Sequence, residues 1–172
     1  MLASGCNYNK FYDLDTQKDV NNSDIIDNVE KTINLIYLKS KNKNKPFSVY
    51  KEIINLLIKS NTYLNDKNNS NMTPFILASM YGNKEILELM IDNGSNISEK
   101  DEFGNNALLY SARSGNYDTF KYLISKGIDI NYENNNKNNA LILASSYNNF
   151  DIVKELISKG VNINGKNNLN ET

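Results

Sequence analysis

A repeat with a period of 33 residues constrains this sequence more than any other feature. From Thr73 onward, equivalent residue types return at this interval without a gap as far as Asn164. The clearest sets are Thr73, Asn106 and Asn139, then Gly94, Gly127 and Gly160, and then Ile97, Ile130 and Ile163. A fixed period of this length indicates stacked copies of one supersecondary unit, because a single copy cannot bury its own apolar face.

Each copy has the pattern of two short helices joined by a turn. Thr73 is a good N-cap, because its side chain can accept a hydrogen bond from an unpaired helix amide. Pro74 suits the first helical position, where a missing N–H is harmless, and Gly82 fits a left-handed turn between the helices. From Ile86 to Ile91 two apolar pairs stand four residues apart, which is the spacing of one helix face.

The three copies begin TPFILASMYGN, NALLYSARSGN and NALILASSYNN, and they end NGSNIS, KGIDIN and KGVNIN. From about Asn65 to Asn164 this pattern resembles the ankyrin repeat, which opens with Thr-Pro-Leu-His and closes with a Gly-Ala-Asp motif. The resemblance implies an all-α fold, an ankyrin-repeat α-solenoid of stacked helix-turn-helix units with short β-hairpin or turn connections. The departures are that Ile76, Leu109 and Ile142 replace the family's histidine, and that Asn-Ala twice replaces Thr-Pro.

The phase of the repeat also divides the chain. We predict a flexible N-terminal segment over 1–22, a degenerate N-terminal capping repeat over 23–65, ankyrin repeats over 66–98, 99–131 and 132–164, and the start of a further, truncated repeat over 165–172. The capping repeat is predicted because the apolar pair Ile53-Ile54 stays in phase, and because the end of a solenoid needs an atypical unit. Since the pattern restarts at Asn167, we expect more repeats beyond Thr172 rather than an uncapped third unit.

The resemblance places partner contacts on the hairpin tips and on the exposed side of each first helix, along the concave surface. The phase gives these positions as Lys67, Asn69, Ser70, Met72, Met80, Tyr81, Lys100, Glu102, Phe103, Asn105, Arg113, Ser114, Glu133, Asn135, Asn136, Asn138, Ser146 and Tyr147. The candidate partner-binding residues among them are Met80, Tyr81, Lys100, Glu102, Phe103, Arg113, Ser114 and Tyr147.

Four of these candidates stand out by their chemistry. Tyr81 and Tyr147 share one phase, so we expect them to line the same groove. Phe103 is an aromatic residue on an otherwise polar tip, and Arg113 is the only arginine in the chain. Tyrosine and arginine often dominate the binding energy of interfaces. The alternative is that the two tyrosines pack against the next unit's helix and that Phe103 folds back onto its own hairpin.

The composition argues against catalysis and against nucleic-acid binding. There is no histidine, which removes the commonest general base and metal ligand. The net charge of −1 gives no general reason to bind nucleic acid or an anionic membrane. The stretch Gly160 to Lys166 lacks the Ser or Thr of a phosphate-binding loop, and Asp66-x-Asn68-x-Ser70 lacks the Gly and Glu of a calcium loop. We predict no cofactor, no metal and no nucleic-acid partner.

Asparagine makes up roughly a fifth of the chain. We attribute this bias to a genome rich in A and T rather than to a prion-like role. The bias also scatters Asn-x-Ser/Thr triplets such as Asn71-Met72-Thr73, which we do not interpret as glycosylation sites.

The only cysteine, Cys6, ends the segment Leu-Ala-Ser-Gly-Cys, which looks like the end of a bacterial lipoprotein signal. The positive and apolar regions of a signal peptide do not precede it. Two interpretations stay open. Either the true start lies upstream of Met1 and Cys6 is lipidated in a cell-envelope lipoprotein, or Cys6 is an ordinary residue in the flexible terminus of a cytoplasmic protein. Membrane contact is expected only through lipidation of Cys6.

We expect a non-catalytic interaction module, in the manner of a bacterial ankyrin protein, that binds an unidentified protein or peptide as a monomer. The alternative is that the repeats are the targeting arm of a longer enzyme whose catalytic domain lies beyond Thr172. The coding sequence past Thr172 separates the two hypotheses, because a capping repeat there supports the first and a new domain supports the second.

Overall fold

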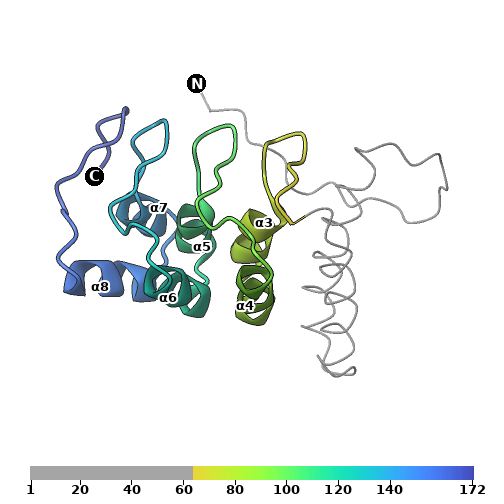
Figure 1. Cartoon of the computed structure of the whole chain (residues 1–172). Coiled ribbons are helices and arrows are strands. Elements are labelled where there is room, and N and C mark those ends of the chain that lie inside the picture. Colours follow the sequence, from red (N-terminus) through yellow and green to blue (C-terminus); the bar gives the residue numbers. More distant parts are fainter. Residues whose placement is uncertain (1–63) are drawn as a thin grey trace, which may run out of the picture.

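The computed structural model of the chain describes residues 64–172 and contains three helix pairs in a row (Figure 1). The pairs are α3 (Pro74–Tyr81) with α4 (Lys84–Asp92), α5 (Ala107–Ser114) with α6 (Tyr117–Ser125), and α7 (Ala140–Ser146) with α8 (Phe150–Ser158). Within residues 64–172 the β pairing is limited to one antiparallel bridge, between Lys100 and Asn106. The predicted all-α solenoid of helix pairs is therefore confirmed. The predicted segment 1–22, the predicted capping repeat as far as residue 63, and Cys6 lie outside the described residues.

The first helix of every pair begins at the predicted capping residue. In each case the side-chain oxygen of the cap accepts a hydrogen bond from the backbone N–H three residues later, which satisfies one of the unpaired amides of a helix start. Pro74 occupies the first turn of α3, also as predicted. The three bonds are Thr73 Oγ1 to Ile76 N at 3.4 Å, Asn106 Oδ1 to Leu109 N at 3.0 Å, and Asn139 Oδ1 to Ile142 N at 3.0 Å.

A tight hairpin precedes each first helix, and a fourth hairpin follows α8. Figure 1 shows these loops extending from the same side of the stack, next to the row formed by α3, α5 and α7. One residue at each tip has a positive φ, a conformation that Asn and Gly adopt more readily than other residues. These residues recur every 33 positions, at Asn71 (57°), Gly104 (77°), Lys137 (58°) and Asn170 (62°).

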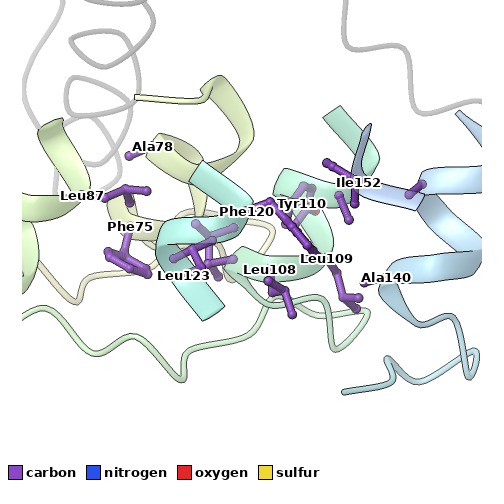
Figure 2. Close-up of a cluster of buried hydrophobic side chains, with 14 of the residues drawn as sticks. Phe75, Ala78, Leu87, Leu108, Leu109, Tyr110, Phe120, Leu123, Ala140 and Ile152 are labelled. Atoms are coloured by element: carbon purple, nitrogen blue, oxygen red, sulfur yellow. The ribbon is translucent and has the colours of Figure 1, made fainter. Parts of the chain in front are cut away.

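The core is continuous from the first pair to the third. Helix α5 packs between α3 and α7, so its residues are buried on two sides by neighbouring units. Phe75, Leu108 and Phe120 are fully buried, and Figure 2 shows them in one cluster with side chains from the first and third pairs. The second helices are amphipathic, since each buries one face and leaves the other exposed. Each unit thus completes the core of the next, as a solenoid requires.

A side-chain amide also joins each helix pair to the pair before it. Asn149 Nδ2 donates to the carbonyl oxygens of Ala112 (2.7 Å) and Arg113 (2.8 Å) near the end of α5. Gly115 lies directly beside this amide with a φ of 74°, and a Cβ on Gly115 would collide with the Asn149 side chain. Glycine is therefore required both for the left-handed turn and for the close approach. The equivalent pair one unit earlier is Gly82 and Asn116.

We expect Gly115→Ala to lower the free energy of unfolding more than Gly127→Ala does. Both glycines have positive φ, 74° and 88°, so both alanines carry a left-handed strain of about 1–2 kcal/mol. No atom lies within 4 Å of a Cβ on Gly127. At Gly115 the new Cβ displaces Asn149 and leaves carbonyl groups unpaired, which adds about 1–3 kcal/mol. Urea denaturation of both variants measures the difference.

The control is the same pair of substitutions in an Asn149→Ala background. Without the Asn149 amide, Gly115→Ala should lose only the backbone strain, and its effect should fall to that of Gly127→Ala. If Gly115→Ala and Gly127→Ala lowered the free energy of unfolding of the parent chain equally, the proposed close approach of Gly115 to Asn149 would be contradicted.

Candidate functional site

The hairpins are closed by one side chain in each unit. Its Oδ1 atom accepts hydrogen bonds from the backbone N–H groups two and four residues later. In the third unit Asn134 accepts from Asn136 (3.0 Å) and Asn138 (2.9 Å). Because Oδ1 holds two successive turn amides, the hairpin keeps one shape. The four closing residues are Asn68, Asp101, Asn134 and Asn167.

Neighbouring hairpins are bonded to each other. Asn134 Nδ2 donates to Asn105 Oδ1 at 2.7 Å, and the backbone N–H of Asn135 donates to the carbonyl of Phe103 at 3.1 Å. The same two bonds join the third hairpin to the fourth, from Asn167 to Asn138 and from Asn168 to Asn136. The spacing between hairpins is therefore set by hydrogen bonds as well as by packing of the helices.

The second hairpin is also anchored to the helix behind it. Asp101 is buried, and its Oδ2 atom accepts hydrogen bonds from Tyr110 Oη (2.7 Å) and Asn105 Nδ2 (2.9 Å). Two backbone N–H groups also donate to its Oδ1 atom. Together these hydrogen bonds offset the free-energy cost of burying the carboxylate. The hairpin that carries Phe103 is thereby held in a fixed position relative to α5.

A groove with a volume of about 250 Å³ lies between the second and third units. Its rim comes from the two hairpins and its floor from α5 and α7. The lining contains aromatic, aliphatic and amide side chains and one cation, but no Asp or Glu. The lining residues are Phe103, Asn105, Leu109, Tyr110, Arg113, Asn134, Asn136, Asn138, Leu143 and Tyr147.

Three sequence-predicted candidates meet in this groove. Phe103 and Tyr147 are each 49% exposed, so neither is withdrawn into the core. Arg113 is half-buried, and its Cζ atom lies 4.9 Å from the centroid of the Tyr147 ring, within the range of a cation–π contact. The result is a mixed aromatic and cationic surface on a hydrogen-bonded frame.

The remaining candidates do not line this groove. Tyr81 is half-buried against the core, although it shares the phase of Tyr147. The expectation that both tyrosines line one groove therefore does not hold for this groove. The candidates outside the groove are Met80, Tyr81, Lys100, Glu102 and Ser114.

Four lining residues were not among the contact positions that the repeat phase gave: Leu109, Tyr110, Asn134 and Leu143. Leu109 and Tyr110 are buried on α5 and Leu143 is half-buried on α7, so residue type and phase do not distinguish them from core residues. Asn134 could have been found from the sequence. An Asn or Asp returns every 33 residues from Asn68 to Asn167, and such a residue favours a turn in which its side chain bonds its own backbone.

A family model described as "Ankyrin repeats (3 copies)" matches residues 47–134, and a second match covers residues 98–167. Together the two matches span more than half of the chain. This chain belongs to the ankyrin repeat family. Ankyrin repeats are generally protein–protein interaction modules, and ankyrin repeat proteins are typically non-catalytic. No match was found among the curated proteins.

Residues 64–172 hold no group of three or more His, Cys, Asp or Glu side chains that could bind a metal ion. In the same part of the ankyrin chain, every helix is too short or too polar to cross a membrane. The ion pairs that the structure shows there lie near the surface: Lys67 with Glu99, Lys84 with Glu88, and Lys159 with Glu155.

The ion pair of Lys67 and Glu99 joins the first two ankyrin units, at the base of their hairpins. Lys67 Nζ lies 2.7 Å from Glu99 Oε2, and Asn96 Nδ2 donates to Glu99 Oε1 at 2.7 Å. The hydrogen bond from Lys67, more than its charge, lowers the pKa of Glu99 below the usual 4.5, and the Asn96 bond acts in the same direction. Partial burial of Glu99 opposes the shift without reversing it.

We expect Glu99→Gln to reduce stability at pH 7 by about 0.2–1 kcal/mol, the usual range for an exposed ion pair. The folded-state pKa of Glu99 lies below its usual value of 4.5, so the contribution is complete above that pH. It disappears as the pH falls through the folded-state pKa. Urea denaturation of the parent and variant chains between pH 7 and pH 3 should show the two curves converging below about pH 4.

Glu102→Gln is the control, because Glu102 is an exposed glutamate without an ion pair among residues 64–172. Its difference from the parent chain should stay small at every pH. A gap for Glu99→Gln that stays constant down to pH 3 would show that the ionised carboxylate contributes nothing.

Proposed function

We propose that this ankyrin chain is a non-catalytic protein-binding module that holds a segment of its partner in the groove between the second and third units. The observation that carries the proposal is the gathering of Phe103, Arg113 and Tyr147 in that groove. Aromatic residues and arginine are the types that most often supply the binding energy of protein interfaces.

The exposure of the two aromatic rings supports binding. Phe103 and Tyr147 each keep about half of their surface in water. Apolar surface that stays in water does not stabilise the folded chain. A partner side chain placed between them would remove that surface from water. At roughly 25 cal/mol per Å², such burial is a substantial driving force for association.

The rigidity of the frame also supports binding. Phe103 lies on a hairpin that is bonded to α5 through Asp101 and to the next hairpin through Asn105. Arg113 rests on Tyr147. Because the side chains are held in place before the partner arrives, less conformational entropy is lost on binding. The absence of histidine from the sequence and the typical behaviour of the family support the non-catalytic part of the proposal.

Single alanine substitutions at Phe103, Arg113 and Tyr147 test the proposal. The partner is first isolated by affinity capture and identified by mass spectrometry, and its affinity is then measured by titration calorimetry. Each substitution should weaken binding at least tenfold, which corresponds to about 1.4 kcal/mol. The loss is expected because a truncated interface anchor typically costs about 2 kcal/mol or more.

Tyr122→Ala and Lys121→Ala are matched controls. Both residues lie on α6, outside the groove. The first substitution removes an aromatic ring and the second removes a cation. They should leave the affinity within about twofold of the parent. The proposal is wrong if the three groove variants bind the captured partner as tightly as these controls do, with all variants shown to be folded by circular dichroism.

A further inference from the structure

We propose that the groove recognises an acidic side chain next to an apolar side chain, within an extended segment of the partner. This inference rests on the proposed function and adds the chemistry of the ligand. It is carried by Arg113, by the free amides on the rim, and by the apolar floor between them.

Arg113 is a cation without a countercharge. It is the only arginine of the chain, and among residues 64–172 it forms no ion pair. The lining of the groove includes no Asp or Glu. Of the carboxylates on the two adjoining hairpins, Asp101 is buried and already accepts four hydrogen bonds. Glu102 and Glu133 are exposed and do not line the groove. A carboxylate supplied by the ligand would therefore pair with the positive charge of Arg113.

The contact with Tyr147 leaves Arg113 able to pair with a carboxylate. The guanidinium of Arg113 lies against one ring, 4.9 Å from its centroid, and stacking of this kind leaves the N–H edge of a planar guanidinium accessible. That edge presents two parallel donors, which match the two oxygens of a carboxylate. The half-buried position of Arg113 strengthens the pairing, because the local dielectric is lower than in open water.

Two asparagines on the rim have unused donors. Within residues 64–172 the side-chain amide of Asn136 and the Nδ2 atom of Asn138 have no hydrogen-bond partner, whereas Asn105 and Asn134 bond each other. Asn136 and Asn138 stand two residues apart on one hairpin. Their amide N–H groups can donate to backbone carbonyls of a bound segment. Donors beside the groove favour a segment that continues past it, and so an internal Asp or Glu rather than a terminal carboxylate.

The remaining surface of the groove is apolar. Leu109 and Leu143 line the groove together with the rings of Phe103 and Tyr147. The volume of about 250 Å³ lies just below the range of roughly 300–1,000 Å³ that is typical of pockets for drug-sized ligands. It therefore suits one or two side chains. The acidic group pairs with Arg113, and its apolar neighbour fills the space between the rings.

An array of fluorescein-labelled, N-acetylated and C-amidated nonapeptides tests this inference. Each peptide places Glu, Gln or Lys at its centre, with Leu or Phe on one side and Gly-Ser spacers at both ends. Fluorescence anisotropy with the whole chain should give the order Glu, then Gln, then Lys, with at least fivefold between Glu and Gln. Arg113→Gln should abolish the preference for Glu over Gln, while Lys121→Gln, which removes an exposed cation of α6, should preserve it. A version with a free C-terminal carboxylate and no central acid should bind no better than the Gln peptide.

The outcomes separate this inference from the proposed function. Peptides that bind with no preference for Glu, but that lose affinity in Phe103→Ala and Tyr147→Ala, would overturn the acidic recognition and leave peptide binding in the groove intact. Absence of binding by every peptide, or binding that no groove variant changes, would overturn both. Displacement of the Glu peptide by a twelve-nucleotide single-stranded RNA at a lower concentration than by unlabelled peptide would also overturn the inference, in favour of a nucleic-acid ligand.

Discussion

The structure depends on one Asn or Asp that closes each hairpin, and in the third and fourth hairpins this asparagine also bonds the hairpin before it. In the third unit, Asn134 Oδ1 holds the turn, and its Nδ2 atom bonds Asn105 of the preceding hairpin. An asparagine can do both because it carries an acceptor and a donor on one planar group. This bond and the backbone bond from Asn135 to Phe103 together join the second and third hairpins.

The groove is a consequence of this bonding. Its two walls are neighbouring hairpins, and their separation is set by bonds that repeat from unit to unit, while its floor is set by the packing of α5 against α7. Stability in such a stack comes from each unit and from its contacts with its neighbours. A change at one hairpin is therefore expected to act on the two adjacent units and on the groove, more than on distant parts of the chain.

The sequence predicted the helix pairs well because their signals are local. Thr73, Asn106 and Asn139 cap helices through their own neighbouring amides, so spacing alone identifies them. The function of the asparagines was missed, because their abundance was attributed to genome composition, whereas Asn134, Asn149 and Asn167 bond across units. The groove was predicted only in part. Phe103, Arg113 and Tyr147 were identified by type, but Tyr81, which shares the phase of Tyr147, is half-buried and lies outside the groove.

The stability of Asn134→Ala, measured by urea denaturation against Asn136→Ala, tests the central claim most directly. Asn136 lies on the same hairpin, but its side chain has no hydrogen-bond partner among residues 64–172, so its loss should change the free energy of unfolding by less than about 0.5 kcal/mol. Asn134→Ala should cost about 1–3 kcal/mol, because it leaves the turn amides and the oxygen of Asn105 unpaired. Equal stabilities for the two variants would contradict the claim that the asparagine bonds hold the hairpins together.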